Sequence, residues 1–158
     1  MAELTFKPYE KEDAEVLLQL FYEMAEYEKI LDQLRATKED LNRWILEEKM
    51  LHMRLICEDG DPIGYVCWYY NFSSFLCKPG LYLEDVFIQP AHRGKGYGKA
   101  ALKMLAKTAV EQNCERFEWV CLDWNEPALK VYESIGARQP GFVLLRLDGE
   151  RLKAFAED

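Results

Sequence analysis

The sequence predicts an α/β (α+β) fold made of one domain that covers residues 1–158. Runs of alternating apolar and polar residues, typical of strands, are interleaved with runs whose apolar residues recur every three or four positions, typical of amphipathic helices. A chain of 158 residues with 49% hydrophobic content can bury a substantial core but leaves no room for a second domain.

The first half of the chain shows three predicted strands and two predicted helices. Alternation predicts a strand at 4–7 and apolar spacing predicts a helix at 12–27, while Thr37 is placed to cap a second helix. Strands at 52–57 and 63–70 flank a turn-forming stretch, which indicates an antiparallel hairpin. We expect residues 71–80 to form a polar and aromatic connection to a central strand at 81–88.

The second half continues with a helix that follows a glycine-rich loop and with a strand at 117–121. Asn125 is placed as the N-cap of a helix that ends at Gly136. We expect a last strand at 143–147 and a C-terminal turn or helix at 150–155.

Composition narrows the class of protein. A formal net charge of −8 argues against a nucleic-acid partner and suits a cationic substrate, although it also serves solubility alone. Five cysteines without a C-x-x-C pair, and only two histidines, give little material for a disulfide framework, a metal site or a His-based triad. The sequence shows no bilayer-length apolar run and no secretion signal, so we expect a cytoplasmic protein without a membrane partner.

The stretch after the central strand carries the clearest chemical signal. Glycines at alternate positions open the first turn of a helix, where unpaired N–H groups and partial positive charge bind phosphate. We therefore interpret it as a cradle for a diphosphate, formed by Gly94, Gly96 and Gly98 together with the cations Arg93, Lys95 and Lys99.

Two better-known glycine loops do not fit this spacing. The dinucleotide fingerprint needs its third glycine three residues after the second, and a P-loop needs Ser or Thr where Ala100 stands. A glycine-rich turn that merely starts a helix remains the alternative.

The pattern Arg93-x-x-Gly96-x-Gly98 resembles the acetyl-CoA signature of the GNAT superfamily of N-acetyltransferases. Three further stretches, in register over nearly the whole chain, resemble the spermidine/spermine (diamine) acetyltransferases: Ala25-Glu26-Tyr27-Glu28, Tyr82-Leu83-Glu84-Asp85 and Trp124-Asn125-Glu126-Pro127. The resemblance implies a mixed, mostly antiparallel central sheet of about six or seven strands with helices on both faces. It also implies acetyl-CoA as cosubstrate, no metal and a homodimer.

The resemblance also assigns site residues. Tyr27, Glu28, Glu84 and Asp85 would bind the amine. The residues implied to bind acetyl-CoA are Val86, Phe87, Ile88, Arg93, Gly94, Lys95, Gly96, Tyr97, Gly98, Lys99, Asn125, Glu126, Pro127, Ala128 and Tyr132.

Acetyl transfer to an amine needs a proton acceptor, because an alkylammonium is almost wholly protonated at neutral pH. Alternation along a strand places Glu84 and Asp85 on opposite faces, and we expect Glu84 to accept the proton. The resemblance makes Tyr132 the general acid for the thiolate. The structural alternatives are that the two acids lie at a solvent-exposed strand end and that Tyr132 is packed in the core.

Three functions remain open from the sequence. The first is N-acetylation of a small cationic amine, such as a diamine, a polyamine or a lysine-like amino acid. The others are N-acetylation of a protein or peptide and a non-catalytic acyl-CoA sensor. Phe75 and Leu76 stand where related enzymes often carry a substrate-stacking Trp, so the identity of the amine stays open.

Overall fold

The computed structural model describes residues 1–157, which divide into two compact units, a first unit of residues 1–120 and a second unit of residues 121–157. Each unit is described by itself. Among the described residues, no helix combines the length and apolar character needed to cross a bilayer.

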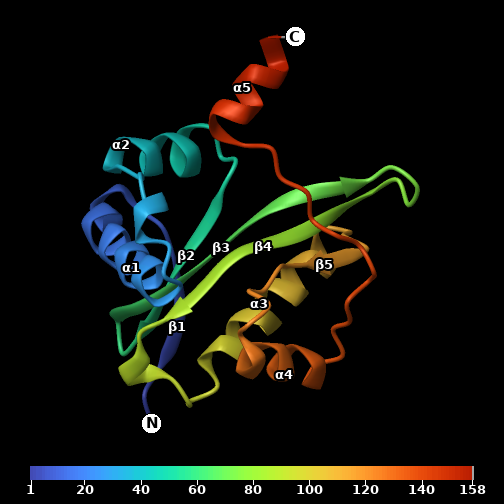
Figure 1. Cartoon of the computed structure of the whole chain (residues 1–158). Helices are drawn as coiled ribbons and strands as arrows, with labels where there is room; N and C mark the ends of the chain where they lie inside the picture. Colours follow the sequence, from blue (N-terminus) through green and yellow to red (C-terminus); the bar gives the residue numbers. More distant parts are fainter. Residues whose placement is uncertain (158) are drawn as a thin grey trace. The chain divides into compact units, whose positions relative to one another are not determined.

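The first unit is built on a five-stranded sheet with the order β1-β2-β3-β4-β5 (Figure 1). The strands are β1 (Leu4–Pro8), β2 (His52–Glu58), β3 (Asp61–Ser73), β4 (Lys78–Ile88) and β5 (Arg116–Glu118). Neighbouring strands are antiparallel except for β4 and β5, which are parallel. The mixed, mostly antiparallel sheet is confirmed, but the expected count of six or seven strands is too high.

Helices cover both faces of this sheet, as expected. Helix α1 (Ala14–Tyr27) and helix α2 (Lys38–Leu41), which runs on into a π-helical segment η3 (Asn42–Glu47), lie on one face. Helix α3 (Tyr97–Glu111) lies on the other (Figure 1). Thr37 caps α2 as predicted, because its side chain accepts from the Asp40 N–H at 3.2 Å.

Alternation along the strands explains the core. One face of β2 and β3 packs against α1 and α2 in a single buried cluster that includes Leu17, Leu20, Leu55, Tyr65 and Phe87. The intervening residues, such as Ile56 and Val66, are also fully buried, so the sheet is covered on both sides. Such a double-sided core holds the centre of β4 in place.

Two expectations about strand limits are wrong. Residues 71–80 are not a connection, because β3 and β4 stay paired as far as Ser73 and Lys78 and leave only a tight hairpin end. Cross-strand pairing outweighs the turn-forming residues there. The predicted strand at 117–121 is shorter, since β5 finds partners only at Gly80–Tyr82 of β4.

The second unit contains two helices, α4 (Glu126–Ser134) and α5 (Gly149–Glu157), and α5 matches the predicted C-terminal helix. The predicted strand at 143–147 is wrong: this apolar run has no ladder partner among the described residues and is exposed. An alternating pattern marks strand propensity, but a strand forms only where a second backbone accepts its hydrogen bonds.

Candidate functional site

A β-bulge interrupts the middle of β4. Cys67 of β3 pairs with Asp85, whereas the next residue, Trp68, pairs with Leu83, so Glu84 is the extra residue of the bulge. Regular alternation, on which the expectation of opposite faces rested, does not hold across such a bulge. Glu84 is exposed and Asp85 is half-buried.

Asp85 occupies an environment that disfavours its charge. Its pKa is raised from 3.8 to about 7, first by burial and then by the negative charges of Glu84 and Glu28. The Cys67 thiol donates to Asp85 Oδ2 at 3.9 Å, and burial raises the pKa of that thiol well above its usual value. A half-buried carboxylate among other carboxylates is a site that an external cation would stabilise.

The end of α1 contributes the third acid and an aromatic ring. Burial raises the pKa of Glu28, the residue that follows α1. Tyr27, the last residue of α1, lies under the Arg93 guanidinium, which is 4.8 Å from the ring centroid. The structure thus brings Glu28, Glu84 and Asp85 together within the first unit, and we call these three residues the acidic cluster.

Past the bulge, β4 has one open edge. On that side β5 pairs only with Gly80–Tyr82, and no other strand of the described chain pairs there. Val86, Phe87 and Ile88 lie in this part of β4 and pair with β3 on the other side. Main-chain groups along such an edge can accept an extended, amide-containing ligand as an additional strand, although the Ile88 carbonyl already accepts from Arg93 Nε.

The glycine loop, residues 93–98, follows β4 and a short 3-10 turn at Pro90–His92. Gly94 and Gly96 have φ of +79° and +81°, and a Cβ at either position would meet nothing within 4 Å. Gly96 is the N-cap of α3, and its carbonyl accepts from the Ala100 N–H at 3.0 Å. The N–H groups of Tyr97, Gly98 and Lys99 precede this bond and have no intrahelical partner.

This open loop fits the diphosphate of acetyl-CoA. Bare backbone borders the space at the start of α3, where main-chain donors and the helix dipole favour an anion. The predicted cradle therefore has the required access.

Two cationic side chains of this segment, those of Arg93 and Lys95, bond to other parts of the protein. Arg93 Nε donates to the Ile88 carbonyl at 2.8 Å, in addition to its contact with Tyr27. Lys95 Nζ donates to Glu58 Oε2 at 2.9 Å, whereas Lys99 is exposed in the first turn of α3. Main-chain N–H groups, more than side-chain charges, are thus presented by the loop.

Glu58 at the end of β2 collects three contacts from this segment. Tyr97 donates its hydroxyl at 2.5 Å, Lys95 at 2.9 Å, and His92 Nδ1 lies 3.1 Å from the other carboxylate oxygen. These hydrogen bonds, that of Tyr97 first, lower the Glu58 pKa to about 2. The sequence does not reveal this role, because Glu58 falls in the turn-forming stretch between the predicted strands at 52–57 and 63–70.

The remaining predicted site residues lie in the second unit. The Asn125 side chain accepts from the Ala128 N–H at 3.4 Å, which confirms that Asn125 caps α4. Glu126, Pro127 and Ala128 form its first turn, and Tyr132 is a half-buried residue two turns along. Their roles toward a ligand stay predictions.

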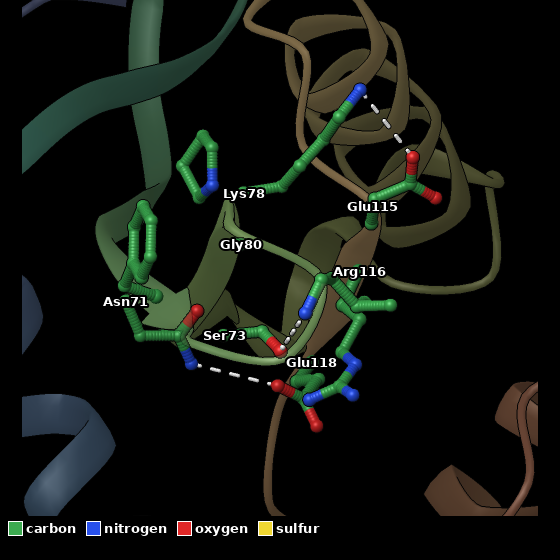
Figure 2. A pocket seen from close by; sticks show the side chains of 10 residues that line it. Asn71, Ser73, Lys78, Gly80, Glu115, Arg116 and Glu118 are labelled. Atoms are coloured by element: carbon green, nitrogen blue, oxygen red, sulfur yellow. Dashed lines mark hydrogen bonds and ion pairs between the residues drawn. The ribbon is translucent and has the colours of Figure 1, made fainter.

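A shallow hollow of ≈ 230 Å³ lies elsewhere in the first unit, where β5 meets the ends of β3 and β4 (Figure 2). Lys78 pairs with Glu115 at 3.5 Å and Asn71 donates to Glu118 at 3.5 Å, as Figure 2 shows. The hollow is lined by residues at the start of β4, whereas the bulge lies further along this strand, at Glu84. Its polar groups satisfy one another, so we assign it no role in the site.

The profile of the acetyltransferase (GNAT) family matches residues 14–137 of the chain. The chain is 30% identical over 99% of both sequences to a thialysine N-epsilon-acetyltransferase of Sus scrofa. It is 42% identical to an L-ornithine N5-acetyltransferase of Arabidopsis thaliana, over 68% of this chain and 46% of that protein. A spermidine/spermine N(1)-acetyltransferase-like protein of Homo sapiens is 30% identical, over 89% of this chain and 22% of that protein.

The candidate site thus combines an acidic cluster beside a bulged strand with an open glycine loop at a helix start. With the family match over most of its length, the chain belongs to the GNAT family and is an acetyltransferase.

Proposed function

We propose that the protein transfers an acetyl group from acetyl-CoA to a primary amine of a small cationic substrate. The amine belongs to a lysine-like amino acid or to a diamine or polyamine. The observation that carries this proposal is the acidic cluster, in which Asp85 is destabilised as an anion by burial and by two neighbouring carboxylates. An ammonium group supplies the positive charge that these residues do not find within the cluster.

The relatives support the same substrate class. The names of two of them specify thialysine and ornithine, which are amino acids with a side-chain amine. A third name refers to spermidine and spermine, which are polyamines. These substrates share an alkylammonium chain, which matches the charge of the acidic cluster.

The proposed chemistry uses one base and one acid. Glu84, exposed at the bulge, accepts the proton of the ammonium directly or through water, and the neutral amine attacks the thioester carbonyl that acetyl-CoA supplies. As the carbon–nitrogen bond forms and the carbon–sulfur bond breaks, Tyr132 donates a proton to the departing thiolate. Asp85, Glu28 and Tyr27 hold the rest of the substrate chain.

The proposed cofactor contacts follow from the open edge of β4 and from the glycine loop. Main-chain groups of Val86, Phe87 and Ile88 pair with the pantetheine arm and help to hold the thioester carbonyl, while residues 93–99 hold the diphosphate. Asn125 adds an amide contact to pantetheine. Because the family match runs from residue 14 to residue 137, across the boundary of the units, we propose that both form one GNAT domain.

We also propose a homodimer. The run 142–147 of the second unit exposes several large apolar side chains, Phe142 and Leu145 among them, and exposed apolar runs mark association surfaces. Light scattering on the purified protein tests this: a monomeric mass at micromolar concentration would contradict it.

A thiol-release assay with acetyl-CoA and a panel of amines tests the proposed function. The panel contains lysine, thialysine, ornithine, putrescine and spermidine, with a lysine-containing peptide as the comparison. We expect turnover with at least one small amine and little with the peptide. The proposal would be contradicted if only the peptide were turned over, or if none of the amines gave thiol release.

A further inference from the structure

We infer that Glu58 is a positioning residue that holds the glycine loop in the conformation that accepts the diphosphate, without itself contacting the ligand. This inference rests on the proposed function, because it assumes that the loop binds acetyl-CoA. Glu58 lies outside the family signature and outside every group of site residues predicted from the sequence.

The contacts converge from both sides of the glycines. His92 precedes Gly94, Lys95 lies between Gly94 and Gly96, and Tyr97 follows Gly96, yet all three side chains reach one carboxylate. A glycine-rich segment has the largest conformational freedom of any backbone, so its order must come from contacts outside the glycines. Glu58 supplies those contacts, together with the Arg93 bond to Ile88.

Glu58 is well placed as an anchor. Its backbone pairs with Leu4 of β1 on one side and with Asp61 of β3 on the other, so it is fixed within the sheet. Its side chain is only 13% exposed. The carboxylate stays ionised throughout the neutral range because its three donors keep its pKa low. A group held in this way restricts the loop before any ligand arrives, and such preorganisation strengthens binding.

Electrostatics alone predicts the opposite sign, which makes the inference testable. Glu58 places a negative charge beside a loop that binds phosphates, so its removal should tighten CoA binding if charge were the dominant effect. If ordering of the loop dominates, the same removal should weaken CoA binding. Glu58→Gln keeps the size of the side chain and removes the charge, and therefore separates the two effects.

The matched control is Asp61→Asn. Asp61 lies in the same hairpin, is exposed, and loses the same unit of charge on substitution. It pairs with Glu58 in the strand ladder, but the three side chains that bond to Glu58 come from the glycine-loop segment and not from this hairpin. We expect the control to bind CoA as the unsubstituted protein does.

The experiment combines calorimetry with CoA and hydrogen–deuterium exchange of the loop. For Glu58→Gln we expect the Kd for CoA to rise about tenfold and kcat at saturating acetyl-CoA to change by less than about twofold. The amides of residues 93–98 should exchange faster in the ligand-free variant and stay unchanged in Asp61→Asn. Tyr97→Phe removes one donor and keeps Glu58, so it should weaken CoA binding about threefold. In the double variant with Glu58→Gln, the Tyr97→Phe substitution should weaken CoA binding little further.

The outcomes separate the two proposals. If the unsubstituted protein takes up no CoA, the proposed function fails and this inference fails with it. If that protein binds CoA but Glu58→Gln binds it equally or more tightly, only the positioning role is overturned. Should Glu58→Gln fail to fold, Tyr97→Phe decides, because unchanged CoA binding and unchanged loop exchange in that variant would overturn the inference.

Discussion

Two carboxylates of the first unit, Glu58 and Asp85, lie in opposite environments. Glu58 has three donors around it, and they lower its pKa to about 2. Asp85 is half-buried and lies near two further acids. Burial and, after it, the charges of these acids raise its pKa to about 7. Within the glycine loop, Lys95 thus has a carboxylate partner in the protein, whereas the charged neighbours of Asp85 are further carboxylates.

This difference indicates how one site can serve ligands of opposite charge. The loop, in which Arg93 bonds to the Ile88 carbonyl and Lys95 to Glu58, presents main-chain N–H groups to an anion. The acidic cluster, in which burial and neighbouring carboxylates destabilise the Asp85 anion, is suited to an ammonium group. An overall charge of −8 favours the amine and requires that the anion be held by local donors.

The largest expected effect comes from Glu84 in the acidic cluster. Loss of a general base typically costs about 100-fold or more in rate, so Glu84→Gln should lower kcat/KM by about 100-fold and change the pH profile of the reaction. Steady-state rates from pH 6 to pH 10 measure this. Glu26→Gln, which removes a charge from the exposed side of α1, is the control. An unchanged rate and profile for Glu84→Gln would show that Glu84 is not the base.

Tyr132→Phe should have the next largest effect. Removing the proposed general acid should lower kcat by about tenfold to 100-fold, while the Kd for acetyl-CoA stays nearly the same. Single-turnover rates and calorimetry distinguish the two quantities. Tyr22→Phe removes an exposed phenol from α1 as the control. A normal kcat for Tyr132→Phe would show that Tyr132 is not the general acid and serves in packing.

Gly96→Ala tests the loop itself. With φ at +81°, an alanine is strained by about 1 kcal/mol, and its methyl group occupies the open side of the cradle. We expect the Kd for CoA to rise about tenfold. Gly141→Ala, at φ +85° with open space around it, carries a matched strain. If both variants lower CoA binding equally, strain and not the cradle explains the loss.

Stability provides a separate test, at Asp85. Its pKa is about 7 in the folded protein against an ordinary 3.8, so between these pH values the native state binds a proton that the unfolded chain has lost. The free energy of unfolding should therefore fall as pH rises through this window, by up to about 1.4 kcal/mol per pH unit. Asp85→Asn should remove this fall, as urea unfolding at pH 5 and pH 8 measures. An unchanged slope would contradict the raised pKa.

Local signals account for what the sequence predicted well. The Thr37 and Asn125 caps depend on neighbours within a few residues, and the structure confirms them. The antiparallel pairing of β2 and β3 followed from the turn-forming residues between them, whereas the register shift between Ile56 and Cys57 did not.

Features that depend on distant backbone could not be predicted in this way. The bulge at Glu84 arises from the register between β3 and β4, and an alternating pattern does not reveal one extra residue. The run 143–147 has strand propensity without a strand partner among the described residues. Glu58 reaches Tyr97 across 39 positions of the chain, so only the fold shows that they meet.

A crossed kinetic measurement tests the contrast between the two carboxylates most directly. With one active amine from the panel, the KM values for acetyl-CoA and for the amine are determined for Glu58→Gln and for Asp85→Asn. We predict that Glu58→Gln raises only the KM for acetyl-CoA and that Asp85→Asn raises only the KM for the amine. If either variant raises both KM values to the same extent, it is wrong that the glycine loop serves acetyl-CoA and the acidic cluster serves the amine.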